Sequence, residues 1–120
     1  MTAEPDGVAK FIADLDRIGI KAAVNGPAVI YEVVPPAGAR AGTKLQTGVS
    51  SSELASWPAI APHWIHFPAD VTFAVTNTDQ IECLEGWARH SRDVGAWNMD
   101  RDPIYNWRAH ILGVSSEVTS

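Results

Sequence analysis

A run of β-branched and aromatic residues at positions 28–34 limits most strongly how this chain can fold. Turn-forming residues at 25–27 precede the run, and Pro35 and Pro36 follow it, so the pattern predicts a strand with defined ends. Residues 43–49 show enough alternation of side-chain character to favour an antiparallel neighbour for this strand. The centre of the chain therefore predicts a β meander.

Further strand patterns follow a proline-rich stretch. The prolines at 58 and 62 bias the residue before each of them toward extended geometry. Residues 63–67 then predict a short strand, with Trp64 and His66 on one face and His63, Ile65 and Phe67 on the other. Residues 71–75 predict either a fourth short strand or an extended arm.

A helix pattern comes before these strands. Between residues 4 and 19 the apolar side chains fall three or four positions apart, which predicts a helix of about twelve residues with one apolar face. Asp6 is suited to cap its start, and Gly19 to end it in a left-handed conformation. The apolar positions are Val8, Phe11, Ile12, Leu15 and Ile18.

A second helix pattern closes the chain. Asp102 and Pro103 are typical of a helix start, because Asp accepts from free N–H groups and Pro has none to leave unpaired. The apolar periodicity predicts a helix over residues 103–112 that packs on the sheet, with Gly113 marking its end. Residues 115–120 are expected to form a frayed tail.

Length and charge exclude several classes of protein. The chain has 120 residues, which suits one domain with a single core, and its formal net charge is −5. That charge argues against a general nucleic-acid binder, which needs clustered cations. No apolar run approaches transmembrane length and no secretory signal is present, so we expect a cytoplasmic protein without a membrane partner.

The segment at residues 75–97 has no clear period. A long irregular segment in so short a domain is usually functional. It contains the only cysteine of the chain, Cys83, together with two of the five tryptophans. Cys83 is therefore the candidate nucleophile, because a thiolate attacks carbonyl carbon readily.

Several motifs along the chain resemble those of one family. Trp57-Pro58 and Ala61-Pro62 precede a predicted strand. Cys83-Leu84-Glu85 and residues 87–92 lie in the irregular segment, and Trp97 precedes the last helix. Together with the order of elements, they resemble the ubiquitin-conjugating (UBC-like) family, most closely its divergent prokaryotic branch. Asn77 is the nearest match to the Asn of the family's His-Pro-Asn tripeptide, whose His and Pro this chain lacks.

The resemblance implies a fold and an activity. The fold is a single α+β domain of the UBC-like type over residues 1–120: an N-terminal helix, an antiparallel meander of three or four strands, a long active-site loop, and a C-terminal helix packed on the sheet. Cys83 would receive a ubiquitin-like modifier protein from an activating enzyme as a thioester. It would pass the modifier to an amine or hydroxyl in a bacterial conjugation pathway, to which a metallopeptidase could also belong. No small-molecule cofactor is implied.

Three residues are candidates to assist Cys83. Asn77 is the candidate oxyanion donor, although an Asn in a turn is commonly a local cap. Asp79 could activate the acceptor and His90 could act as a base if either side chain lies near the sulfur. The neighbouring charges, Arg89, His90, Arg92, Glu82 and Glu85, act on the thiol pKa in opposite directions, so the sequence predicts no net shift.

Other readings of these residues remain open. Cys83 could be a small buried apolar residue, and the domain an inactive UBC-like module that binds the modifier or its activating enzyme. His63, His66, His90 and Cys83 have the atoms that bind zinc, but residues three apart on a strand face opposite sides. Ser91 next to His90 suggests a serine nucleophile with its base, a geometry that adjacent residues rarely provide.

Overall fold

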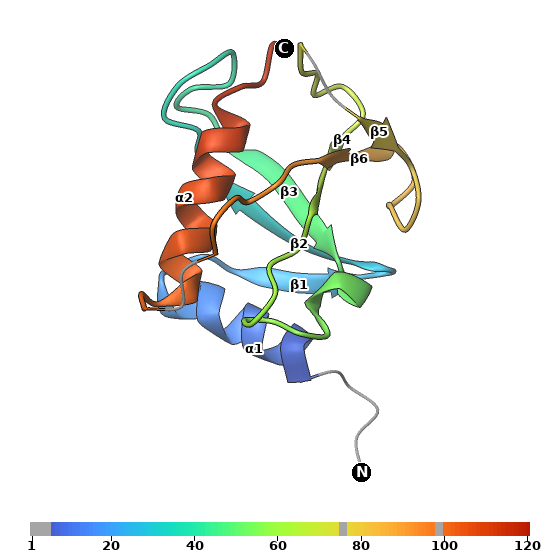
Figure 1. Ribbon diagram of the computed structural model, residues 1–120. Helices are drawn as coiled ribbons and strands as arrows, with labels where there is room; N and C mark the ends of the chain where they lie inside the picture. Colours follow the sequence, from blue (N-terminus) through green and yellow to red (C-terminus); the bar gives the residue numbers. More distant parts are fainter. Residues whose placement is uncertain (1–5, 75–76, 98–99) are drawn as a thin grey trace.

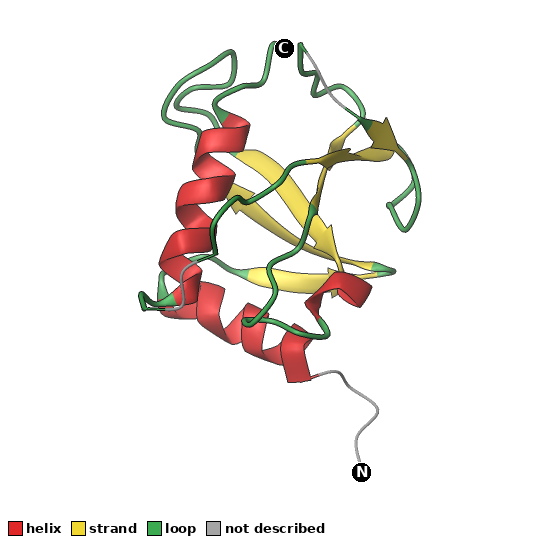
Figure 2. Ribbon diagram, in the orientation of Figure 1, coloured by secondary structure: helices red, strands yellow, loops and turns green. Residues whose placement is uncertain are grey.

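The computed structural model describes residues 6–74, 77–97 and 100–120. Within them the chain is α+β, with two α-helices and a six-stranded antiparallel sheet in the order β1-β2-β3-β4-β6-β5 (Figure 1 and Figure 2). No helix of this part of the chain is both long and apolar enough to span a membrane. The elements are α1 (Asp6–Arg17), β1 (Ala22–Asn25), β2 (Ala28–Val33), β3 (Leu45–Ser50), the 3-10 helix η1 (Ser51–Leu54), β4 (Trp64–Pro68), β5 (Thr78–Asp79), β6 (Trp87–Ser91) and α2 (Pro103–Ser115).

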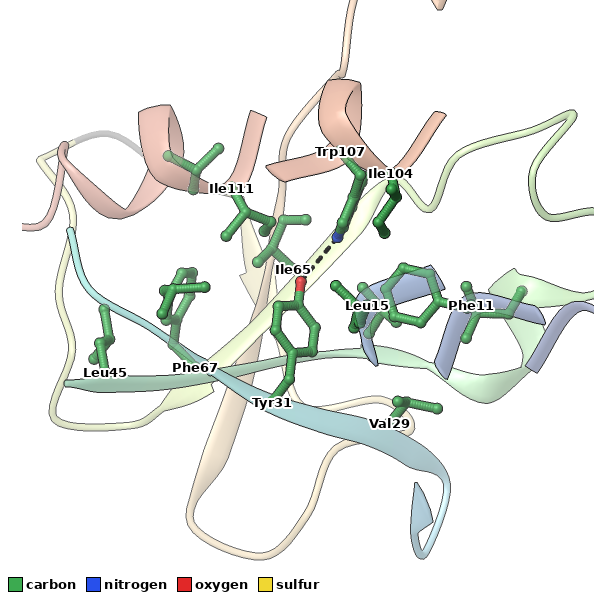
Figure 3. Close-up of a cluster of buried hydrophobic side chains, with 14 of the residues drawn as sticks. Phe11, Leu15, Val29, Tyr31, Leu45, Ile65, Phe67, Ile104, Trp107 and Ile111 are labelled. Atoms are coloured by element: carbon green, nitrogen blue, oxygen red, sulfur yellow. Dashed lines mark hydrogen bonds between the residues drawn. The ribbon is translucent and has the colours of Figure 1, made fainter. Parts of the chain in front are cut away.

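The core lies between both helices and one face of the sheet. Side chains from α1, α2 and strands β2 to β4 point into one apolar cluster (Figure 3). Trp107 of α2 is fully buried there, and its indole N–H donates to the hydroxyl of Tyr31 on β2 at 2.9 Å. The hydrogen bond satisfies two polar atoms that would otherwise be buried without partners, which fixes how α2 lies on the sheet.

A buried carboxylate joins α1 to the rest of the domain. Asp14 is 3% exposed and accepts hydrogen bonds from the Trp57 indole, Lys10 and Arg17, each at 3.0 Å. Burial alone would raise the pKa of Asp14, but these three hydrogen bonds outweigh it and hold the pKa below its usual value. Arg17 also binds Asp102, the residue that caps α2, at 2.9 Å. One network therefore connects α1, the proline-rich segment and α2.

The sequence predicted the helices and three strands correctly, within a few residues. Gly19 ends α1 in the left-handed conformation (φ 84°), and the Asp102 carboxylate accepts the Ile104 N–H, as expected of caps. α1 begins at Asp6, but whether the Asp6 side chain caps it lies outside the described residues. α2 runs three residues past the predicted end, because an exposed glycine, Gly113, costs a helix only about 1 kcal/mol.

Other parts of the prediction are wrong. β1 was not predicted, because its four residues show no burial pattern of their own. Of the two alternatives for residues 71–75, the strand is not formed by the described residues 71–74, where Phe73 makes only an isolated bridge to Val118; residue 75 lies outside the described part of the chain. That bridge, together with the hydrogen bond from Thr119 N–H to the Thr72 carbonyl at 2.7 Å, docks the C-terminus. Val118 is buried, so the predicted frayed tail is packed on the domain.

We expect Asp14→Asn to lower the free energy of unfolding by about 2 kcal/mol at neutral pH, because it removes a buried charge that accepts hydrogen bonds from three donors. The folded pKa of Asp14 lies below its unfolded value, so its contribution is present above about pH 4 and is lost as pH falls through the folded pKa. Urea unfolding at pH 7 and pH 3 measures both effects. Asp16→Asn is the matched control, because Asp16 is exposed. Equal losses in the two variants at pH 7 would contradict this account.

Candidate functional site

Cys83 lies in a compact turn between β5 and β6. The Cys83 N–H donates to the Gln80 carbonyl at 3.3 Å and the Trp87 N–H to the Leu84 carbonyl at 3.0 Å. These bonds form two consecutive turns, and Glu82 adopts a left-handed φ of 57° in the first. The segment predicted to be irregular therefore contains a hairpin, whose strands are too short to show a period. The Cys83 side chain is partly exposed at this turn.

The turn is anchored to distant parts of the chain. The Ser52 hydroxyl, from η1, hydrogen-bonds the Glu82 carboxylate, with its oxygen 2.9 and 3.0 Å from the two carboxylate oxygens. Leu84 reaches the β1–β2 turn, where a β-carbon placed on Gly26 would be 3.5 Å from a Leu84 methyl. Contacts from two separate elements therefore hold Cys83 in position.

Arg89 is the central charge of this site. Its Nε donates to Asp79 Oδ1 at 2.7 Å, and its Nη1 lies 3.8 Å from a Glu82 carboxylate oxygen. The guanidinium carbon is 4.2 Å from the ring centre of Trp64, a cation–π arrangement that covers the arginine. The hydrogen bond from Arg89 lowers the pKa of Asp79, which also accepts the Ile81 N–H at 2.9 Å. Asp79 is thus ionised and engaged in holding the hairpin.

The structure determines the direction in which the pKa of the Cys83 thiol is shifted, which the sequence left open. Burial raises its pKa, the nearby Arg89 lowers it, and Asp79 and Glu82 raise it again. The net shift is upward, because partial burial and two carboxylates together outweigh one arginine. At neutral pH Cys83 is therefore a protonated thiol.

His66 lies buried below this cluster. Strand register places it opposite Gly48 on β3 and opposite Arg89 on β6, on the sheet face turned away from the helices. Its Nε2 is 2.9 Å from the Ser50 hydroxyl, and its Nδ1 has no hydrogen-bond partner among the described residues. Burial, with a smaller effect of Arg89, lowers the pKa of His66 to about 4, so the ring is neutral. The alternation of residues 63–67 was the only sequence signal that His66 lies on the sheet face opposite Ile65 and Phe67.

The other predicted assistants are placed differently. Asn77 accepts the Ser91 N–H through its backbone carbonyl at 2.9 Å, beside the start of β5. The His90 ring packs 4.7 Å from the Phe73 ring and 5.9 Å from the Phe67 ring, measured between centroids, and burial lowers its pKa. His90 follows Arg89 on β6, so the two side chains point to opposite faces. Asp79 therefore lies with Cys83, whereas His90 belongs to the core.

The structure pairs Ser91 with His63, not with His90 as suggested by their adjacency. The Ser91 hydroxyl is hydrogen-bonded to His63 Nε2, because the two residues lie at the same end of the β4–β6 pair. Glu53 accepts the His63 backbone N–H at 3.0 Å, so this carboxylate holds the main chain and does not orient the ring. Within the described ranges, no three His, Cys, Asp or Glu side chains are arranged to hold a metal ion.

Comparisons with models of protein families, with characterised proteins and with solved structures give no match to this chain.

We expect stability to fall between pH 6.5 and about 4, in part because the unfolded chain binds a proton at His66 that the folded chain does not. At pH 4.5 protonation of His66 in the unfolded chain should account for about 2.5 kcal/mol of this loss. Urea unfolding at pH 7 and pH 4.5 should therefore show a smaller acid-induced loss for His66→Gln than for the wild type. His63→Gln, at an exposed histidine, should keep the wild-type loss. An unchanged loss in His66→Gln would show that His66 does not resist protonation.

Glu82→Gln should make Cys83 more reactive, because Glu82 raises the thiol pKa. We expect alkylation by iodoacetamide at pH 7.5 to be about two- to fivefold faster. The matched control is Glu85→Gln, since Glu85 does not act on the thiol. If both variants react alike, the increase reflects net charge and not the contact geometry.

Proposed function

We propose that this chain is a UBC-like transferase that carries a ubiquitin-like protein as a thioester on Cys83 and passes it to an acceptor. The order of elements supports this proposal. After α1, strands β1 to β4 follow one another in a meander, then come the cysteine-containing turn and α2 on the sheet. This is the order that the resemblance implies.

The observation that carries the proposal is the position of Cys83. A cysteine that only fills space belongs in an apolar core, yet this one is partly exposed in a turn held by Ser52 and Arg89 through carboxylates of the hairpin. A covalent carrier needs a fixed and accessible sulfur, because the incoming carbonyl is attached to a large protein. Cys83 meets both requirements.

The chemistry follows from the charges. The Cys83 sulfur attacks the thioester carbonyl on the activating enzyme, the bond from that carbonyl to the enzyme's sulfur breaks, and the proton of Cys83 passes through solvent to the departing sulfur. The product thioester is neutral. Asp79 and Glu82 disfavour a free thiolate at Cys83, so the proton leaves as the bond to the carbonyl carbon forms, and the neutral thioester carries no charge for these carboxylates to oppose. In the second step an acceptor amine attacks, an amide forms and Cys83 regains its proton.

The roles of the assisting residues remain part of this proposal. Asp79 is ionised and could take the acceptor's proton once Arg89 releases it. Asn77 stays the candidate oxyanion donor, at the start of the hairpin. His90 packs against Phe67 and Phe73, so the geometry gives no support to its role as a base.

A second function is favoured by the charges around Cys83. The raised pKa of Cys83 and the engagement of Arg89 with Asp79 leave the thiol without an evident activator. These features suit an inactive UBC-like module that binds the modifier or its activating enzyme without forming a bond.

Incubation with the native activating enzyme, modifier and ATP tests both functions. A transferase should give an adduct on non-reducing gels that thiol reductant removes. Cys83→Ser should give an adduct that resists reductant but not mild alkali, because an oxygen ester replaces the thioester, and Cys83→Ala should give none. An adduct that persists in Cys83→Ala would refute the carrier role. Binding without any adduct, unchanged in Cys83→Ala, would establish the inactive module.

A further inference from the structure

A groove is lined by residues that follow α1, by the end of β2 and by the middle of α2. Figure 1 shows α2 on the side of the molecule away from the β5–β6 turn. The apolar lining of the groove comes from Ile18, Ile20, Val33 and Leu112, and Val34 at its rim is 50% exposed. The volume is about 270 Å³. Small-molecule sites usually have roughly 300–1,000 Å³, so this groove suits one or two side chains of a peptide better than a cofactor.

Two cations of the groove have no carboxylate partner in the described part of the chain. They are Lys44 and Arg108. Six of the nine Lys and Arg residues form ion pairs there, and the remaining one, Arg101, does not line the groove. Glu32 is the one carboxylate among the described lining residues. The groove is therefore locally cationic on a protein whose net charge is −5.

The exposed face of α2 extends the groove. Tyr105, Arg108 and Leu112 are spaced three and four residues apart, so they form one stripe along the helix. The Arg108 guanidinium lies 5.0 Å from the centre of the Tyr105 ring, and Tyr105 is 44% exposed. An aromatic ring beside an arginine offers both apolar contact and charge, a combination that is common at the centres of protein interfaces.

We propose that this groove binds a segment of a partner protein in which a large apolar side chain is flanked by carboxylates. The apolar side chain would enter between Ile20 and Leu112, and the carboxylates would pair with Lys44 and Arg108. Two cations offset by Glu32 are too few for a nucleic-acid backbone or an anionic membrane surface, which both favour larger basic clusters. This inference is independent of the chemistry at Cys83.

Fluorescence anisotropy with three labelled peptides tests the proposal. In the first peptide a Leu-Phe pair is flanked by Glu residues, in the second Lys replaces each Glu, and in the third Ser replaces Leu and Phe. The first should bind about tenfold more tightly than the other two, and less tightly as salt is raised. Arg108→Glu should weaken its binding about tenfold, whereas Arg101→Glu, the same charge change outside the groove, should leave it within about twofold.

The charge-reversed double variant Lys44→Glu with Arg108→Glu should prefer the basic peptide. Circular dichroism of each variant establishes that it is folded, and amide chemical shifts should move at Val34 and Leu112 when the acidic peptide is added. The proposal is overturned if the peptides bind alike, if Arg101→Glu weakens binding as much as Arg108→Glu, or if the shifts lie elsewhere. It is also overturned if anionic vesicles or a second copy of this chain occupy the groove in place of the acidic peptide.

Discussion

The rest of the structure depends on the buried carboxylate of Asp14. It binds the indole of Trp57, which precedes β4, and shares Arg17 with the cap of α2. A buried charge is tolerated only when its acceptor sites are filled, so this one residue requires α1, the proline-rich segment and α2 to meet at one place. That meeting covers the aromatic core, in which the Phe11 ring lies 4.9 Å from the Trp57 ring between centroids. The entry of the chain into β4 is fixed as a result.

The two faces of β4 lie in different environments. Ile65 and Phe67 point into the core, whereas His66 and Trp64 belong to the opposite face, where Arg89 joins them from β6. The short turn at Cys83 covers this second, polar face. Burying these polar groups costs free energy unless they are paired, and their pairing is what fixes the turn. A rigid and acidic surrounding for the thiol follows directly from how the hairpin is held.

Sequence patterns predicted the helices and strands that bury one apolar face against the core. α1 and α2 each present one apolar stripe to the core, and their caps depend on the local residues Gly19 and Asp102. β1, β5 and β6 escaped prediction. β1 and β5 lie at the edges of the sheet and are too short to show alternation, and the sequence of β6 does not alternate between apolar and polar side chains. The C-terminus was mistaken for a frayed tail because its order comes from Thr72 and Phe73, which are distant in sequence.

The sequence by itself determined that the only cysteine, Cys83, lies in a non-helical segment between the last predicted strand and the last helix, and that neighbouring strand residues face opposite ways. It could not determine which charges reach the thiol, because that depends on distances across strands. Only the tertiary structure brought Arg89 and Asp79 to Cys83, sent His90 into the core and paired Ser91 with His63. Adjacency in sequence places side chains on opposite faces of a strand, whereas pairing between strands places them together.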